Sequence, residues 1–573
     1  MRVSKNIIST APLRRAVIRL LNFASLAALL AAANGFCGSP PAPFLPVPPS
    51  HPVYDLLERL ETRQMITFHS SLKPLSRGEI TQSLLIIREI ADSGEGFLSR
   101  REIQDLRRFL REFNVEGDYP PSNIARLREK LWDKAPVYRD GLNLFQHRGT
   151  GYSIEVNPLL YWDFLADSSG ETISRRTSGL HLEAGLGEHF GCSFDFRDTQ
   201  EGGRGPYNTG ERYKLYQDRA AYITLDGDDV CYYDITRATI SAGWNRLWLN
   251  FGRGDNRWGP GRFGALMLSD NPPPFDFLSA RYDIADFLRF AYLMGSLHPY
   301  PEVYSSIDTT ISGQERRIIA GKYLAAHRLE IYPCRGVEIG LAESVIYGER
   351  GLEPAYLNPL NLYFSAEHNL GDMDNVAWSG DAKLNLIPGI TFYGELFIDD
   401  MKTRELGTSY YSNKFAWTTG AFIVDPLKFR NSDFTIEYSR IEPFVYTHFY
   451  SINVYKNWNS SLGHFLPPNS ECLFLRAGWK PFYTVSGTVS AAFLRHGRNT
   501  AELNAGGDID TPVEPNHTQT PFMAGEEFTS TVYELRMKWE PLEYYYLEGK
   551  VRNHRWSGGE SNEWQVTFGV NVW

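Results

Sequence analysis

The feature that most limits how this chain can fold is an alternation of apolar and polar residues, which recurs from about residue 151 onward. The clearest segments are residues 152–156, 190–196, 483–493, 531–539 and 564–572. A repeat of two residues puts apolar side chains on one face of a β-strand and polar side chains on the other. The pattern therefore predicts a large architecture built from two-faced strands.

Two architectures use such strands. A soluble sandwich buries the apolar face against a second sheet, whereas a membrane barrel turns it toward lipid. The barrel is favoured because the strands are about 9–11 residues long, which suits a tilted bilayer crossing. Many strands carry Tyr or Trp near an end, as interfacial girdles do, and the chain ends on Trp573. We predict an all-β transmembrane barrel over residues 140–573, with about 18 antiparallel strands.

Connections of two lengths separate the predicted strands. Short ones containing proline fall at residues 331–333, 387–389, 441–443, 479–481 and 539–541, and long polar ones at 347–375, 456–470, 497–527 and 552–562. Membrane barrels have short periplasmic turns and long external loops, and proline suits a turn because it cannot donate to a sheet ladder. The alternation fails near Asp425-Pro426, so either a strand is missed there or one connection is misassigned.

The amino terminus has the layout of an export signal. Basic residues without an acid precede a mostly apolar run over residues 20–33, which ends in the small residues Ala31 and Ala33. This run is too short for a membrane-spanning helix and is typical of a secretory signal peptide, predicted over residues 1–33. Lipidation of Cys37 stays open, although the preceding Phe36 is bulkier than a lipid-attachment site requires.

A proline-rich stretch and a small helical module are predicted between the signal and the barrel. Residues 34–50 are expected to form a semi-rigid linker. Over residues 51–135 apolar residues recur with helical spacing, and Ser76 with Glu79 and Ser99 with Glu102 form capping boxes. Because the module follows an export signal and precedes the first strand, we expect it on the periplasmic side.

Charge and motif content exclude several classes of function. The formal net charge of −10 argues against a nucleic-acid partner, because phosphate binding needs a basic face. The five cysteines lack metal-ligand spacing, and no two of the 13 histidines are four residues apart, as a zinc site on a helix would require. The chain has no nucleophile elbow and no phosphate loop. We predict no enzymatic activity, no metal and no cofactor.

One motif is more specific than the strand pattern. Residues 251–261 read Phe-Gly-Arg-Gly-Asp-Asn-Arg-Trp-Gly-Pro-Gly, and residues 266–275 read Leu-Met-Leu-Ser-Asp-Asn-Pro-Pro-Pro-Phe. These segments resemble the capsule-assembly (Wzi-type) outer-membrane protein family, and further matches lie at residues 327–330, 340–344, 356–359, 374–375, 380–381 and 399–400. The resemblance implies an outer-membrane barrel with a periplasmic helical part. It also implies a role in attaching capsular polysaccharide, as in the best-known members.

A second resemblance lies in the helical module. Residues 54–60, followed by residues 74–80, resemble one S-layer homology module, which grips cell-wall polymers in other proteins. This resemblance implies contact between residues 51–135 and a cell-wall polymer. The alternative is a plain helical bundle packed on the barrel.

The central motif predicts a rigid turn. Gly259 and Gly261 permit backbone angles closed to other residues, and Pro260 fixes its own φ. The unit is expected to fold back, and a place inside the lumen is one option. It would either present neighbouring side chains to a ligand or brace an internal loop against the barrel wall.

Candidate glycan-binding residues come from this motif and from the long loops. The flat apolar face of Trp258 suits a sugar ring, and polar groups near it are Arg257, Asp270 and Asn271. In the loops expected outside the cell, the aromatic and histidine side chains able to contact sugars are Tyr356, Trp458, His464 and Trp556. Loop aromatics are also common at membrane rims, so both interpretations stay open.

Several carboxylates are expected to face the lumen. A pair of carboxylates carries out glycosidic cleavage in many hydrolases. A wide barrel, however, needs charged lumen residues paired with Arg, so we interpret them as lumen carboxylates without a catalytic role: Glu343, Asp381, Asp399 and Asp400.

Three functions remain in view. The first is a surface barrel that binds, retains or assembles an exopolysaccharide. The second is a structural barrel whose helical module tethers the wall. The third is a diffusion channel, which requires an open lumen and is inconsistent with a plug.

Overall fold

A computed structural model describes residues 43–94, 97–115, 119–131, 137–138, 142–203, 223–226, 230–309, 311, 313, 315–514 and 517–571. The predicted signal peptide, Cys37 and Trp573 lie outside the described residues. Among the described residues, no helix is long and apolar enough to cross a membrane.

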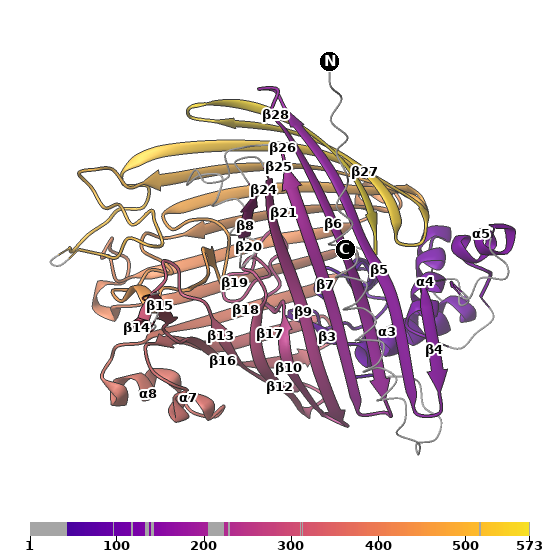
Figure 1. The fold of residues 1–573 in the computed structure, drawn as a ribbon, viewed down its shortest axis with the longest axis horizontal. Coiled ribbons are helices and arrows are strands. Elements are labelled where there is room, and N and C mark those ends of the chain that lie inside the picture. The colour runs from indigo at the N-terminus through magenta and orange to yellow at the C-terminus, as the bar shows by residue number, and fades with distance from the viewer. Residues whose placement is uncertain are drawn as a thin grey trace.

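Eighteen antiparallel strands close into one barrel (Figure 1). In ring order they are β5 (Tyr152–Asp167), β6 (Thr172–Leu186), β7 (Phe190–Gly202), β9 (Val230–Trp244), β10 (Leu247–Gly254), β12 (Phe275–Ala285), β13 (Leu288–Leu297), β16 (Lys322–Cys334), β17 (Val337–Gly348), β18 (Asn375–Ile387), β19 (Ile390–Asp400), β20 (Lys414–Val424), β21 (Ser432–Ile441), β24 (Ser470–Phe482), β25 (Val485–Arg498), β26 (Glu526–Leu542), β27 (Tyr545–Trp556) and β28 (Gly559–Val570). Strand β28 pairs with β5, placing Val566 opposite Phe164, and this pairing closes the ring. The predicted barrel and its strand number are confirmed.

Smaller β elements flank this ring. Strand β4 (Phe145–Gly149) pairs with β5, and β8 (Ile223–Asp226) pairs with β9. Outside the barrel sheet, β14 (Tyr304–Thr309) pairs with β15 (Glu315–Ile319), and β22 (Lys456–Asn457) pairs with β23 (Ser460–Ser461).

The alternation in the sequence places an apolar belt on the outside of the barrel. In β28, Trp564, Val566 and Phe568 are exposed, and they continue a series of exposed apolar side chains around the wall: Leu160, Trp162, Phe164, Ile240, Phe251, Leu278, Leu341, Phe392, Leu396, Val489, Leu535, Met537 and Val551. No second sheet covers this belt among the described residues. The outer face is therefore that of a membrane barrel and not of a soluble sandwich.

The long connections lie at one end of the barrel, together with two short ones, 168–171 and 557–558. Three predicted short turns are displaced: residues 331–333, 479–481 and 539–541 belong to the ends of β16, β24 and β26, and the turns follow at 335–336, 483–484 and 543–544. Two further predictions are wrong. Residues 441–443 do not form a short turn; they begin the long connection 442–469, and the short turn is 425–431, which contains Asp425-Pro426. Proline interrupts pairing at either end of a strand, so it does not identify the end. Residues 552–562 are not a loop, because β27 and β28 continue to Trp556 and from Gly559.

The amino-terminal module contains α2 (Val53–Thr62), α3 (Arg77–Ser93), α4 (Arg100–Glu112) and α5 (Asn123–Leu131). Both capping boxes are present: Ser76 and Ser99 accept from the backbone of Glu79 and Glu102, whose side chains bond back. The helices pack around buried apolar side chains: Leu57, Leu60, Ile80, Leu84, Leu106 and Phe109.

The proline-rich stretch is packed on the barrel from Pro43 onward, so this part is not a free linker. Strand β1 (Pro46–Val47) pairs with β3 (Leu75–Ser76), and Val47 is buried. The carbonyl of Phe44 accepts from Trp248 Nε1 of the barrel at 2.7 Å. Strand β1 lies between turns at residues 43–44 and 49–50, and the prolines, which fix their own φ, limit the conformations of this segment.

The module packs into the short-turn end of the barrel, opposite the long loops (Figure 1). Its side chains reach turns and strand ends around the ring. Polar contacts join Arg77 to Glu183, Gln64 to Asn385, Arg59 to Asp425, Asp105 to Lys480 and Asn123 to Glu543. These contacts involve strands from both halves of the ring, so the module plugs this end.

Candidate functional site

The long connection between β10 and β12, residues 255–274, folds back into the barrel interior; we call it the inner loop. Within it, β11 (Arg257–Trp258) pairs antiparallel with β2 (Leu72–Lys73) of the module. The amide of Gly259 donates to the carbonyl of Ser71 at 2.7 Å. The inner loop and the module thus form one continuous filling of the lumen.

The turn at Gly259 fits only glycine. Its φ is +128°, and a Cβ atom there would lie 2.4 Å from Glu395 Oε1. Both the backbone angle and this close approach therefore exclude a side chain.

Two carboxylates of the barrel wall hold the inner loop through its backbone. Glu395 accepts from the amides of Gly261 at 2.6 Å and Leu266 at 2.7 Å. Glu437 accepts from the amides of Arg262 at 2.6 Å and Phe263 at 3.0 Å. These bonds satisfy amides that no sheet ladder pairs, which buried backbone requires. Neither carboxylate was among the residues predicted from sequence.

An ion-pair cluster connects the inner loop to helix α2. The Glu58 carboxylate accepts hydrogen bonds from Arg262 Nη1 at 2.6 Å and from Lys73 Nζ at 2.6 Å. Burial opposes the charge of Glu58, but Lys73 and Arg262 outweigh it and hold the pKa of this carboxyl well below its usual range. Glu58 is therefore a charged link between three segments: module helix, module strand and inner loop.

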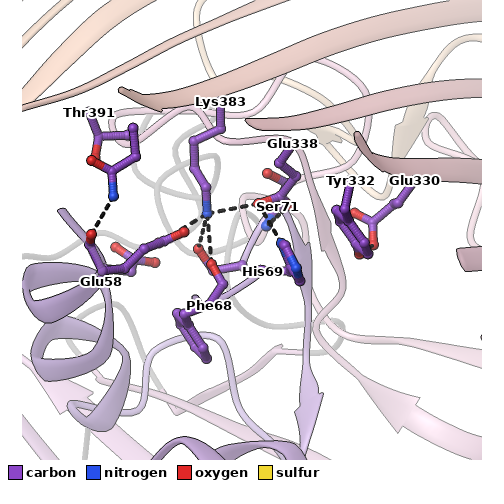
Figure 2. Close-up of polar contacts among 12 residues, drawn as sticks. Glu58, Phe68, His69, Ser71, Glu330, Tyr332, Glu338, Lys383 and Thr391 are labelled. Atoms are coloured by element: carbon purple, nitrogen blue, oxygen red, sulfur yellow. Dashed lines mark hydrogen bonds and ion pairs between the residues drawn. The ribbon is translucent and has the colours of Figure 1, made fainter. Parts of the chain in front are cut away.

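A second cluster surrounds Lys383, which projects from β18 toward the module (Figure 2). Its Nζ lies 2.8 Å from Glu338 Oε2 of β17 and 3.2 Å from Glu61 Oε2 of α2. It also donates to the carbonyl of Phe68 and to Ser70 Oγ. Burial raises the pKa of Glu61 to about 7, although Lys383 opposes the rise. An adjacent contact stacks the His69 ring on Tyr332 at 3.6 Å between centroids.

The motif residues predicted to bind glycan make structural contacts of the inner loop. Trp258 is 3% exposed and packs in the lumen core, so it has no free face for a sugar ring. Arg257 Nη1 donates to Asp270 Oδ1 at 3.1 Å. Asn271 Nδ2 donates to the carbonyl of Ser461 at 3.0 Å, which fastens the inner loop to an outer one.

The four predicted loop residues divide into two pairs. Tyr356 and His464 are completely buried, because Tyr356 packs against the wall and His464 lies over Gly264. Trp458 is half-buried and stacks on His298 at 3.5 Å between centroids. Trp556 is half-buried at the long-loop end of β27, beside His554.

The four predicted lumen carboxylates have different surroundings. Asp400 is exposed at the end of β19 and accepts from the amide of Met401 at 2.7 Å. Asp381 forms a bidentate pair with Arg328, at 2.5 and 3.0 Å, inside the barrel. Asp399 Oδ2 accepts from the amide of Tyr446 at 2.7 Å. Glu343 is not a lumen residue: it shares the outward phase of β17 with the exposed Leu341 and lies beneath a helix on the outer wall. None of these carboxylates lies free in a cleft as an acid–base pair would.

Together these contacts define a class of protein: a membrane β-barrel whose lumen is filled by its own module and inner loop. The filling is apolar at its centre, where Leu72, Trp258 and Leu266 pack with Tyr446 and Tyr455. Tyr446 and Tyr455 donate to the carbonyls of Leu266 and Met267.

The family follows from comparison with known proteins. A family model described as capsule assembly protein Wzi matches residues 168–563, so the chain belongs to this family of outer-membrane barrels. A search of curated sequences gave no significant match.

One solved structure supports the fold. The chain is similar to Wzi of Escherichia coli, with 13% identity, a TM-score of 0.55, and coverage of 92% of this chain and 99% of that one. That protein is described as an outer-membrane, carbohydrate-binding barrel involved in group 1 capsule assembly. More distant similarities are to OprD of Pseudomonas aeruginosa (11% identity, TM-score 0.39, 73% of this chain and 94% of that one) and a BenF-like porin of Pseudomonas fluorescens (8%, 0.42, 73% and 99%).

Proposed function

We propose that this protein is a non-catalytic platform that holds capsular or related surface polysaccharide at the outer membrane, and that glycan contacts its long-loop end. The filled lumen carries this proposal. With the module at one end and the inner loop behind it, the long loops are the surface left for an extracellular polymer. A filled lumen also opposes the diffusion-channel alternative.

The short-turn end, with the module, faces the periplasm in this proposal. Membrane barrels place short turns there and long loops outside. The orientation predicts that protease added to intact cells leaves residues 51–133 uncut, whereas permeabilised cells allow cutting. Cleavage of the module in intact cells would contradict it.

Wall tethering by residues 51–135 is the weaker alternative. In the segments that resemble an S-layer homology module, Tyr54 is buried and donates to the carbonyl of Val47. Glu79 is bound to Arg281 and Arg289 of the barrel. These side chains are engaged within the protein, which supports plugging over polymer binding.

The proposed glycan contacts are exposed or half-exposed rings at the long-loop end of the barrel. Phe449 and Tyr450 are 61% and 52% exposed in the 442–469 connection. One face of the Trp458 ring stacks on His298, which leaves the other face for a ligand. Trp556 lies on the inward-facing side of β27 at the long-loop end and points away from lipid. Each ring contributes about 1 kcal/mol, so repeated contacts along a polymer must act together.

The test measures polysaccharide retained on cells of a deletion strain that carries variants of this protein. Replacing Phe449, Tyr450, Trp458 and Trp556 by Ala should release polysaccharide into the medium without unfolding the barrel. The matched control is Phe97→Ala, which removes an exposed ring at the opposite end. Unchanged retention by the fourfold variant, with a folded barrel, would remove these loops from the proposal.

A further inference from the structure

The connection between β17 and β18 folds back against the outer wall of the barrel. It contains α7 (Pro354–Leu357) and α8 (Tyr363–Leu370), which lie on the flank near the long-loop end (Figure 1). Helix α8 contacts β17 and β18. We call residues 352–373 the flank hairpin.

The wall beneath the flank hairpin is the outward face. In β17, Ser344 points inward, since its Oγ lies 3.3 Å from the hydroxyl of Tyr455 in the lumen core. Its neighbours Glu343 and Val345 therefore point outward, in phase with Leu341, which is 52% exposed. Val345 packs against Tyr356 and Tyr363 of the hairpin.

The hairpin covers a polar cluster that would otherwise face lipid. Glu343 is paired across the strands with His327 and Trp378, and its carboxylate lies 3.2 Å from His327 Nε2 and 3.1 Å from Trp378 Nε1. It also accepts from the first amides of α8, those of Tyr363 at 2.8 Å and Phe364 at 2.9 Å. Glu343 is 3% exposed, so α8 both satisfies and shields it.

This cluster lies at the height of the apolar belt. Glu343 is six residues from Val337 at the short-turn end of β17, about 20 Å along the strand. The apolar band of a membrane barrel is about 25 Å tall, and strand tilt brings Glu343 lower still. The hairpin therefore begins within this band.

The surface that the flank hairpin turns away from the barrel carries a cluster of apolar side chains. The exposed apolar residues are Leu352, Leu357, Leu360, Leu362, Phe364, Leu370 and Met373, from 40% to 81% exposed. Polar residues are exposed beside them: Asn358, Ser365, His368, Asn369 and Asp372. Phe364 contacts the outward Trp378, with 5.0 Å between centroids, so this patch continues the belt. Clustered apolar exposure of this kind marks an interaction surface.

We propose that the flank hairpin is a membrane-interaction segment. Its outer leucines contact acyl chains of the outer leaflet, and its buried face covers the Glu343–His327 pair. The occupant is lipid because the patch is continuous with the lipid-facing wall and lies at its height. The arrangement is that of an interfacial amphipathic helix, here seated on a barrel.

The test is photocrosslinking in intact cells, with p-benzoylphenylalanine introduced in place of Leu360, Leu362 or Leu370. Leu341, on the bare wall, is the positive control, and Leu503, an equally apolar loop residue that is 42% exposed, is the negative control. We expect lipid adducts at the three hairpin positions and at Leu341, and none at Leu503. Protein adducts alone, or no adducts, at the hairpin positions while Leu341 reacts would overturn the proposal.

A second measurement does not depend on the photoreactive group. The variant Leu360→Ser, Leu362→Ser, Leu370→Ser changes only exposed side chains, so folding should be retained. Its unfolding midpoint should fall in lipid vesicles and stay unchanged in a lipid-free amphipathic polymer, relative to the parent protein. A variant midpoint equal to that of the parent protein in lipid vesicles would contradict lipid contact.

Discussion

Arg262 of the inner loop donates to Glu58 of helix α2 at 2.6 Å, joining two segments that are 204 residues apart in the chain. Lys73 binds the same carboxylate from a third segment. The plug is therefore fastened to the inner loop as well as to the wall, and the lumen filling behaves as one unit.

Removing the charge of Glu58 should loosen this unit. Glu58→Gln leaves Arg262 and Lys73 without their buried partner, and breaking a buried pair costs about 3–5 kcal/mol. Denaturant unfolding of the full chain measures the loss. The control is Glu315→Gln, whose partner Arg317 is largely exposed, and where a change of about 0–1 kcal/mol is expected. Equal effects of the two substitutions would contradict the role of Glu58.

Stability should depend on pH through Glu79. Burial opposes its charge, but Arg289 and Arg281 outweigh burial and lower its pKa to about 2 from the model-compound value of 4.5. Its stabilisation is therefore fully present above pH 4.5 and is lost as the pH falls toward 2. Glu79→Gln should destabilise the protein at pH 7 and have a smaller effect near pH 2. A pH-independent difference in unfolding free energy would argue against this ion pair.

Glu61 should act in the opposite direction. Because its folded-state pKa is raised to about 7 by burial, the charged form is disfavoured in the folded state. This penalty is present above pH 7 and disappears as the pH falls to 4.5. Glu61→Gln should therefore reduce the gain in stability between pH 7 and 4.5, measured by unfolding at both values. A gain identical to that of the parent protein would show that Glu61 is not its source.

A side chain at Gly259 should displace the inner loop. Gly259→Ala brings a Cβ atom to 2.4 Å from Glu395 Oε1 and strains a φ of +128°, with an expected loss of about 1–3 kcal/mol. Gly407→Ala is the matched control, since Gly407 also has positive φ but open space around it. The difference between the two variants in thermal unfolding isolates the packing contribution; no difference would argue against it.

Two tryptophans should separate stability from glycan retention. Trp258→Ala empties a site in the lumen core and should cost about 3–5 kcal/mol. Trp458→Ala removes a half-exposed ring and should leave the unfolding free energy almost unchanged. It should lower polysaccharide retention when Phe449, Tyr450 and Trp556 are already replaced by Ala. Normal stability of Trp258→Ala would contradict its role in the core.

The strands, the barrel and both capping boxes could be predicted because their signals are local. A capping box spans four residues, and the alternation of a strand repeats every two. The family motif at residues 251–275 also identified the inner loop as special before its place was known. Strand boundaries were harder to predict. The polar residues at 552–562 suggest a loop, but most of them form the paired ends of β27 and β28.

The candidate site was harder to predict because proximity in this barrel is not encoded by neighbouring residues. Glu395 and Glu437 belong to polar faces like many other acids, and only the inner loop distinguishes them. Trp258 has the side chain of a sugar-binding residue, yet its burial assigns it to packing.

The sequence by itself determined that this chain forms two-faced strands and a capped helical module, because periodicity and capping are properties of residues close together in the chain. The tertiary structure decided what fills the lumen and which acids face it. Glu343 illustrates the reason. Alternation shows which residues share a face of the strand with Glu343, but not whether that face points to the lumen or to lipid. The closed ring places this carboxylate outside the lumen, and the helix folded over the outer wall keeps it away from lipid.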